Sequence, residues 1–294
     1  MLIEELRNSC FFRYRNFNDN TLDEILTGNV WHSKPSLLND PFEFNFEFDW
    51  ANFTIDNFVQ INNSLGIFPQ HTMENLYLGA KNLRYQIFDK LETEVRRVIV
   101  ERKEEMESIA FICCFASSPD NPLMWSHYSN GMQGLCIAYN RDTLAKSEDF
   151  KRIIPVEYVD SPYQITHEHL QGELISFQTT PVTYDFSKRT HTAAEIELTF
   201  NVHFKSYKYM FQKHLRWNYE GEHRSLAVSP ASKNAIGCLK NIGSDSISAI
   251  IFGHRMSKTN INILELICRN KEIKMFKATP RRSDFSVTIE EHIF

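Results

Sequence analysis

The stretch IAFICCF at Ile109–Phe115 is a continuous apolar run with the length of a single strand. A run of this kind, without alternation between polar and apolar residues, is typical of a strand that is buried in a sheet. Leu135–Tyr139 and Ile153–Val159 are two further apolar segments of strand length. The sequence therefore predicts a central sheet with buried strands.

Helical periodicity is found on both sides of this stretch. Between Asn82 and Glu107, apolar residues recur at steps of three and four with charged residues between them, which predicts an amphipathic helix. A second helical region is predicted at about Ala193–His214. A short helix is predicted at Asn20–Gly28, where Asn20 or Thr21 provides the cap and the glycine ends the helix.

The remaining strand-like segments are short and spread along the chain. They lie at 10–15, 30–33, 224–228, 247–252, 273–277 and 285–289, and 261–268 has the pattern of a helix. Strands and helices alternate irregularly, without a repeating strand–helix–strand unit. The predicted fold class is α+β: a single domain over 1–294 with a central β-sheet flanked by helices, and a variable helical insertion at about 50–108.

Composition restricts the class of protein. The chain has 294 residues, a formal charge of −5, 42% hydrophobic and 13% aromatic residues, which is not the composition of a disordered protein. It has no apolar run of the roughly 18 to 20 residues that a membrane helix needs, and its start lacks the pattern of a signal peptide. None of the six cysteines forms a C-x-x-C pair. We therefore expect a cytoplasmic protein without a membrane partner. The mild acidity argues against bulk binding of nucleic acid but leaves a local basic groove open.

The first polar cluster combines the FRYR segment at Phe12–Arg15 with the block Trp31–Phe42. Ser33 lies in the strand-like start of this block, and the Asn39-Asp40 pair precedes a proline, which is a signal for a sharp turn. Two interpretations remain open. The turn is either purely structural, or it presents Asn39 and Asp40 to a ligand in a pocket.

The second cluster is the LMWSHY motif at Leu123–Tyr128, which follows a serine-rich turn. Trp125, His127 and Tyr128 offer aromatic surface, a titratable ring and a phenol, all of which a nucleotide-like ligand can use. Alternatively, Trp125 and Tyr128 are three residues apart on one helix face and pack into the core.

The third cluster runs from Lys213 to the segment WNYEGEHR that ends at Arg224. Glu222 would lie at the start of a strand, with Arg224 two residues further along on the same face. A carboxylate in this position suits catalysis, and it equally suits an ion pair with Arg224 or Lys213. Burial would raise the pKa of Glu222 and Arg224 would lower it, so we expect it to be ionised at neutral pH.

Two weaker patterns complete the survey. A strand followed by Gly253 and a helix start is able to bind an anion, but packing explains it as well. His167, His169 and His191 do not have the spacing of ligands on one helix face, so no metal is expected. The chain contains no phosphate-binding glycine loop and no nucleophile elbow.

Together, these clusters resemble the bacterial family called "domain of unknown function 2971". The shared features occur in the same order over about residues 10–255. They are the aromatic-basic-Tyr-Arg start, the Thr-Leu-x-x-Ile helix, the Trp-x-Ser-x-Pro to Asn-Asp-Pro-Phe block, the Leu-Met-Trp-Ser-His-Tyr motif and the closing Trp-x-Tyr-Glu-x-Glu-x-Arg. The segment between Glu43 and Ile109 matches no motif of the family, and the family's name supplies no function.

The order of motifs is also similar, more weakly, to ADP-ribosyltransferases, including the DNA-modifying DarT-type toxins. This resemblance implies a split β-sheet that cradles NAD, with Glu222 as the catalytic glutamate. The arginines would neutralise the pyrophosphate, and aromatic rings would stack on nicotinamide or adenine. The NAD-binding residues that it implies are Arg13, Tyr14, Arg15, Ser33, Asn39, Asp40, Trp125, His127, Tyr128 and Arg224.

The expected function is that of an NAD-dependent ADP-ribosyltransferase or NAD glycohydrolase in phage defence or toxin action. NAD would be the substrate, an antitoxin or defence-system protein a partner, and nucleic acid remains open as the acceptor. One alternative is a non-enzymatic module that senses a nucleotide or a phage protein. A nuclease is the other alternative, although the chain lacks a D-x-E-x-K or HNH-like cluster of metal ligands.

Overall fold

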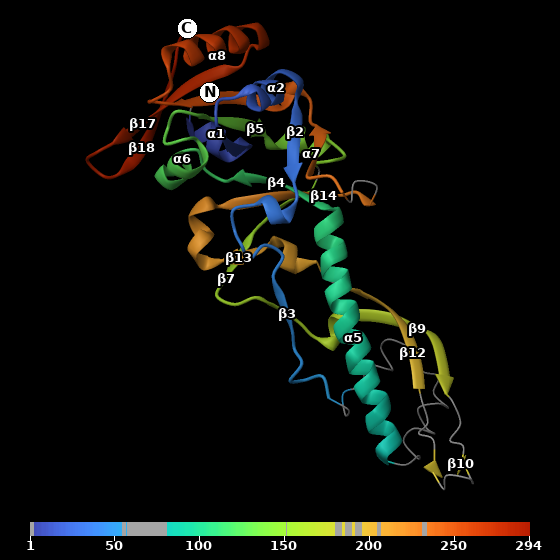
Figure 1. The fold of residues 1–294 in the computed structure, drawn as a ribbon. Helices are drawn as coiled ribbons and strands as arrows, with labels where there is room; N and C mark the ends of the chain where they lie inside the picture. Colours follow the sequence, from blue (N-terminus) through green and yellow to red (C-terminus); the bar gives the residue numbers. More distant parts are fainter. Residues whose placement is uncertain are drawn as a thin grey trace. The chain divides into compact units, whose positions relative to one another are not determined.

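The computed structural model describes residues 3–54, 57, 81–150, 152–179, 184–185, 190–191, 196–204, 207–230 and 234–294. The chain divides into two compact units (Figure 1). Unit 1 comprises Met1–Phe44, Ser108–Ser161 and Phe211–Phe294, and unit 2 comprises Asn45–Glu107 and Pro162–Met210. The single domain over 1–294 stays a prediction.

Unit 1 is built on one mixed sheet. Its strands follow in the order β15 (Gly237–Asn241), β2 (Asn29–Ser33), β4 (Ala110–Ala116), β1 (Cys10–Arg15), β5 (Leu135–Asn140), β16 (Ile247–Gly253), β17 (Lys274–Arg281) and β18 (Ser286–Glu291). In addition, β14 (Glu222–Val228) pairs with β4, and β6 (Ile153–Pro155) pairs with β14. The predicted α+β class with a central sheet is confirmed.

One predicted strand is interrupted. Ile153–Val159 forms β6 and then, after Val156, the separate strand β7 (Glu157–Val159). Strand β7 leaves the main sheet and pairs in parallel with β13 (Gln212–His214). The break follows Pro155, which has no backbone N–H to donate to a ladder.

Helices cover both faces of the sheet. Those on one face are α2 (Asp19–Thr27), α7 (Arg141–Lys146) and α8 (Lys258–Lys271). Those on the other face are α1 (Ile3–Ser9) and α6 (Pro122–Tyr128). Strand β5 contributes Ile137 to the first core and Cys136 to the second, so it is buried on both faces, as its uninterrupted apolar sequence predicts.

Helix α2 begins at Asp19, before the predicted start at Asn20. Its N-cap is Asn18 rather than Asn20 or Thr21, and the Asn18 side chain accepts a hydrogen bond from the backbone N–H of Thr21 at 3.0 Å. Thr21 itself is buried and donates to the backbone of Asn16. The predicted end of the helix is confirmed, since Gly28 adopts the left-handed conformation with φ 75°.

Strands β1 and β2 both pair with β4 but not with each other, so the main sheet divides between them. Strand β14 runs along one edge of β4 over the whole length of that strand. On the opposite edge, β1 pairs with β4 at Ala116 through Phe12, and β2 pairs with it at Ile112 through Ser33. The two strands therefore use different parts of the same edge. Beyond Phe12, the edge of β1 that faces β4 has no ladder partner among the described strands.

Unit 2 contains most of the long helix α5 (Lys81–Ile109), which confirms the helix predicted at 82–107. Its described residues also form three pairs of strands, namely β3 (Phe46–Phe48) with β8 (Tyr163–Ile165), β9 (Leu170–Thr179) with β12 (Ile196–Phe204), and β10 (Tyr184–Asp185) with β11 (Thr190–His191). No helix among the described residues has both the length and the apolar character that crossing a bilayer requires.

The predicted helix at about 193–214 is wrong. Its described part forms β12, the 3-10 helix η3 (Lys208–Phe211) and β13, while 193–195 and 205–206 lie outside the described residues. The sequence IELTFNVHF of β12 has an apolar residue at every second position, from Ile196 to Phe204. This alternation is typical of a strand, and β12 pairs with β9 along its whole length.

Candidate functional site

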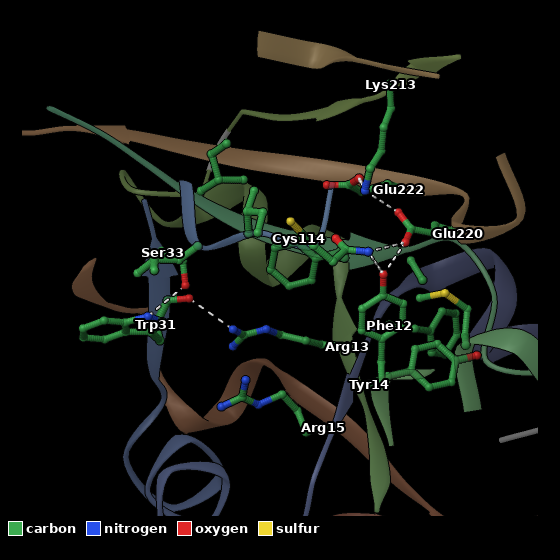
Figure 2. A pocket seen from close by; sticks show the side chains of 18 residues that line it. Phe12, Arg13, Tyr14, Arg15, Trp31, Ser33, Cys114, Lys213, Glu220 and Glu222 are labelled. Carbon is green, nitrogen blue, oxygen red and sulfur yellow. Dashed lines mark hydrogen bonds and ion pairs between the residues drawn. The ribbon is translucent and has the colours of Figure 1, made fainter. Parts of the chain in front are cut away.

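A pocket of about 300 Å³ lies at the division of the sheet in unit 1 (Figure 2). Its walls come from β1, β2 and β4, from the turn after β2, from α6, and from the segment between β13 and the start of β14. The polar side chains that line it include Arg13, Tyr14, Arg15, Ser33, Asn39, Tyr128, Lys213, Glu220 and Glu222. A volume of this size falls within the range of small-molecule sites.

One part of the pocket wall carries two arginines that share a carboxylate. Arg13 and Arg15 are two residues apart on β1 and lie on the same face of the strand. Arg13 donates from Nη1 to Glu24 Oε1 at 2.6 Å and from Nη2 to the carbonyl oxygen of Trp31 at 3.1 Å. Arg15 Nε lies 3.3 Å from Glu24 Oε2, and the Tyr139 hydroxyl donates to Glu24 Oε1 at 2.6 Å. Since one carboxylate faces two guanidinium groups, this group has a formal charge of +1.

The two arginines differ in how well their charge is compensated. Burial by itself lowers the pKa of Arg13, but the acidic groups around it, Cys113 and Glu24, raise the pKa overall. For Arg15, burial and the charge of Arg13 lower the pKa. Among the described residues, Glu24 is the ion-pair partner found for Arg15. Arg15 is thus the cation with the most capacity left for an anionic ligand.

Two carboxylates line another part of the pocket. Glu220 ends the 3-10 helix η4 (Leu215–Glu220), and Glu222 begins β14. Gly221 between them has φ 50°, and a Cβ at this position would lie 2.3 Å from Ser117 Oγ, so this position favours glycine. The backbone turns at Gly221, and both glutamates line the same pocket.

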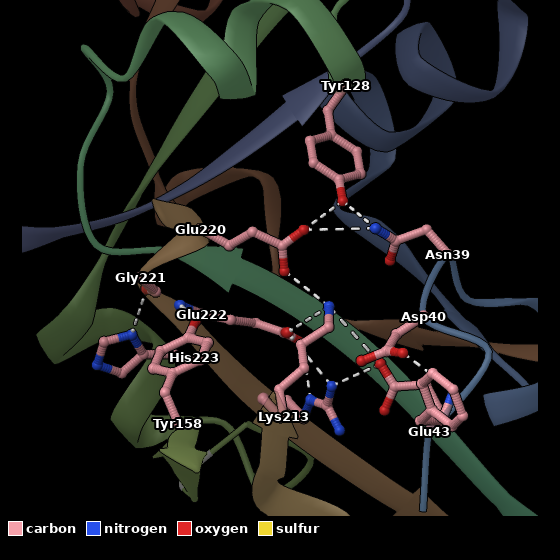
Figure 3. A network of polar contacts seen from close by, with 12 residues as sticks. Asn39, Asp40, Glu43, Tyr128, Tyr158, Lys213, Glu220, Gly221, Glu222 and His223 are labelled. Atoms are coloured by element: carbon pink, nitrogen blue, oxygen red, sulfur yellow. Dashed lines mark hydrogen bonds and ion pairs between the residues drawn. The ribbon is translucent and has the colours of Figure 1, made fainter. Parts of the chain in front are cut away.

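Both carboxylates belong to a buried ion network of five charged residues (Figure 3). Its members are Glu43, Lys213, Glu220, Glu222 and Arg224. Lys213 Nζ lies 2.7 Å from Glu220 Oε2 and 3.2 Å from Glu222 Oε2. Arg224 donates from Nε to Glu222 Oε1 and from Nη2 to Glu43 Oε1, both at 2.7 Å. Each of the five side chains is at most 5% exposed. Because three carboxylates share two cations, the network has a formal charge of −1.

The carboxylates of this network differ in how readily they take a proton. Burial alone would raise the pKa of Glu222, but Arg224 and Lys213 lower it to about 2. For Glu43, burial and the neighbouring charge of Glu222 outweigh the contact with Arg224, and its pKa is raised. Glu43 Oε2 has no hydrogen-bond partner in the described part of the chain. Glu222 is therefore ionised at neutral pH, as predicted, and Glu43 is the carboxyl that gains a proton more readily.

The low pKa of Glu222 predicts how stability depends on pH. The pKa falls from 4.5 to about 2 on folding, so ionised Glu222 stabilises the fold above pH 4.5, and this contribution disappears as the pH falls from 4.5 to 2. We expect the urea midpoint of the wild type to decrease over this range more steeply than that of Glu222→Gln. The variant provides the baseline for all other carboxyl groups. Identical pH profiles for the two proteins would contradict the shifted pKa.

Two further elements reach Glu220 from outside the ion network. Tyr128, the last residue of α6, donates its hydroxyl to Glu220 Oε1, and Asn39 Nδ2 lies 3.4 Å from the same oxygen (Figure 3). Asn39 also donates to the Tyr128 hydroxyl. Burial and Glu220 raise the pKa of Tyr128. On the other side, the Tyr158 hydroxyl accepts the backbone N–H of Glu222 at 2.7 Å.

Four residues of the predicted site do not line the pocket. Trp125 is fully buried and donates from Nε1 to a backbone oxygen at 2.8 Å, so the structural interpretation of this ring holds and it offers no stacking surface. Asp40 is buried and caps its own turn, accepting a backbone N–H at 2.9 Å. His127 is exposed, with its ring next to that of Tyr128. Arg224 is fully buried and forms an ion pair with Glu222.

Glu43, Glu24 and Trp31 belong to this site but were not predicted as site residues. Glu43 follows the Asn-Asp-Pro-Phe turn and carries no motif signal of its own. Glu24 did have a signal, because it lies at helical spacing from Thr21 and Gly28 on the apolar face of the predicted helix, where a carboxylate needs a cationic partner. Trp31 was noted as part of a motif but not as a lining residue.

The comparisons with known proteins bear on the second half of this site. Residues 124–225 match the family described as "Protein of unknown function (DUF2971)". The chain is thus similar to the DUF2971 family over this segment. The match supports the family resemblance there, and the matched segment contains the pocket residues Tyr128, Lys213, Glu220 and Glu222. No curated protein and no solved structure matches the chain. Within the described residues, no group of three or more His, Cys, Asp or Glu side chains is arranged to hold a metal ion.

Proposed function

We propose that this protein binds NAD in the pocket of unit 1 and cleaves its N-glycosidic bond, as an ADP-ribosyltransferase or an NAD glycohydrolase. The observation that carries the proposal is the convergence of Arg13 and Arg15 with an ionised Glu222 in one pocket at the division of a β-sheet. The weak resemblance of the sequence motifs to ADP-ribosyltransferases supports the same reaction by analogy.

The residues of the pocket fit the chemistry of NAD. Guanidinium groups form paired hydrogen bonds with phosphate oxygens, which suits Arg13 and Arg15 to the pyrophosphate. When nicotinamide leaves, positive charge develops on the ribose, and a carboxylate close to it stabilises that charge. Glu222 is the carboxylate whose low pKa guarantees the ionised form.

Glu222 and Glu220 are suited to different tasks. Both oxygens of Glu222 are bound by cations, through Arg224 to Oε1 and through Lys213 to Oε2. Its charge is therefore held in a fixed position and needs no reorganisation during the reaction. Glu220 has one oxygen paired with the Tyr128 hydroxyl, and this pair is the better candidate for removing a proton from the acceptor.

The biological setting is part of the proposal. The resemblance to DarT-type toxins supports a role in phage defence or toxin action, with an antitoxin or defence-system protein as partner. The acceptor of the ADP-ribosyl group is a protein, a nucleic acid or water.

The direct test is release of nicotinamide from NAD by the purified full-length protein. The reaction is run with water alone, with cell extract protein and with DNA or RNA oligonucleotides, and transfer is followed with labelled NAD. We expect nicotinamide release with at least one acceptor and a saturable rise in melting temperature with NAD. Absence of both signals would refute the proposal.

A non-enzymatic nucleotide sensor is the second candidate. It is favoured by one observation, namely that the carboxylate oxygens of both Glu220 and Glu222 already have protein partners. A saturable thermal shift with NAD but no nicotinamide release with any acceptor would decide for the sensor. Nothing in the described residues favours the nuclease alternative.

Arg15→Met should separate ligand binding from stability. Removing Arg15 relieves the repulsion with Arg13 and leaves Glu24 with one cation, so the free energy of unfolding should stay equal or rise by up to about 1 kcal/mol. Affinity for NAD should fall about tenfold or more, because a hydrogen bond to a charged group contributes about 1.5 to 3 kcal/mol. Titration calorimetry and urea unfolding measure the two effects.

Arg13→Met is the matched control for this prediction. It removes hydrogen bonds to Glu24 and to the Trp31 carbonyl, so it should destabilise the fold as well as weaken binding. If Arg15→Met instead left the affinity for NAD unchanged, Arg15 would not contact the phosphates.

A further inference from the structure

Trp31 forms part of the pocket wall beside Arg13, and the proposed function gives it no role (Figure 2). Its indole Nε1 donates to Ser33 Oγ at 3.0 Å, so the polar atom of the ring is satisfied within the protein. The ring lies on Gly237 of β15, where a Cβ would come within 2.2 Å of Cζ2 and 2.4 Å of Cε2. The hydrogen bond and the glycine together fix the indole in one place.

The other aromatic residues of the pocket are engaged elsewhere. Tyr128 donates to Glu220, and Phe12 and Phe115 are buried. Tyr14 donates its hydroxyl to the Ser118 backbone at 2.9 Å, and its ring meets that of Trp125 edge-on in the core. Trp31 is half-buried and lines the pocket, so we consider its ring as a contact for a ligand.

We propose that Trp31 is a stacking platform for the planar base of a nucleotide whose phosphate groups contact Arg13 and Arg15. The Arg13 guanidinium donates to the backbone oxygen of Trp31, so the phosphate contact lies beside the residue that carries the ring. A nucleotide carries its base one ribose away from its phosphate, which matches this adjacency. Stacking on an aromatic ring tolerates any base, because every base has a π-face. The inference rests on the proposed function for the class of ligand, but not for the cleavage step.

The test compares Trp31→Ala with Trp31→Phe in the full-length protein. Trp31→Ala should weaken binding of NAD about tenfold or more, the usual effect of removing an aromatic stacking partner. Trp31→Phe keeps a ring and should bind within about threefold of the wild type. NAD should also quench tryptophan fluorescence in the wild type, and the quenching should be reduced in Trp31→Phe although binding is retained.

Gly237→Ala is the second variant, because it displaces the ring while leaving every lining side chain present. It should weaken NAD binding in the same direction as Trp31→Ala, with melting temperatures measured for all variants. Unchanged affinity in Trp31→Ala, or equally poor binding by Trp31→Phe, would overturn the stacking role. Trp31-dependent binding without nicotinamide release would support stacking and refute cleavage, and a wild type that binds no nucleotide would refute both.

Discussion

Glu222→Gln is expected to lower nicotinamide release by about 10²-fold or more while the protein stays folded. The substitution preserves the shape of the side chain but removes the charge that would stabilise the ribosyl cation, and loss of one electrostatic stabiliser typically has an effect of this size. The fold should tolerate it, because three carboxylates share two cations in the ion network and the variant leaves two of each. Nicotinamide is measured by chromatography and folding by circular dichroism.

Glu220→Gln is the matched control at the neighbouring carboxylate. Glu220→Gln removes the proposed proton acceptor but leaves the charge of Glu222 beside the ribose, so we expect a smaller loss of nicotinamide release. Full turnover by Glu222→Gln would remove this residue from the mechanism without excluding the enzyme. A larger loss in Glu220→Gln than in Glu222→Gln would indicate that Glu220, and not Glu222, stabilises the charge on the ribose.

Arg224→Met is expected to lower the free energy of unfolding by about 3 to 5 kcal/mol, the usual effect of removing one partner of a buried ion pair. Arg224 is fully buried and contacts both Glu222 and Glu43. Without it, three buried carboxylates share Lys213 as their remaining cation in the network. Urea unfolding at neutral pH measures the effect.

Glu43→Gln provides the internal control for this prediction. In the Arg224→Met background it removes one of the surplus carboxylates, so it should restore part of the lost stability. In the wild-type background it should have a smaller effect than Arg224→Met, because Lys213 and Arg224 keep Glu220 and Glu222 as partners. A loss below about 1 kcal/mol in Arg224→Met, the usual value of an exposed pair, would show that the network contributes no more than a surface ion pair.

The elements of unit 1 were predictable from sequence where one local signal dominated. The apolar run Ile109–Phe115 predicts β4, which forms from Ala110 to Ala116 and has partners on both edges. Gly28 ends α2 because a glycine adopts φ 75° without strain. Prediction failed where the spacing of apolar residues was taken for a helical period although it was also that of a strand. The alternation in β12 was assigned to a helix, although pairing with β9 favours the strand.

The site was predictable in part for a related reason. Arg13, Asn39, Tyr128 and Glu222 were each marked by a motif next to a turn or strand end, and the division of the sheet brings them together. Glu43 was not marked, because its partner Arg224 lies 181 positions further along the chain. Nor does a motif distinguish Trp125 from Tyr128, since full burial of one and partial burial of the other depend on how α6 packs on the sheet.

The unequal pairing of charges in unit 1 has a consequence for how a ligand is received. The group of Arg13, Arg15 and Glu24 has one cation in excess, whereas the ion network has one carboxylate in excess. Two opposite poles at one pocket create an electric field across it, which low-dielectric walls strengthen. A molecule with a cationic ring at one end and phosphates further along is a dipole in that field. The pocket therefore favours one orientation of such a molecule and opposes the reverse, before any individual hydrogen bond has formed.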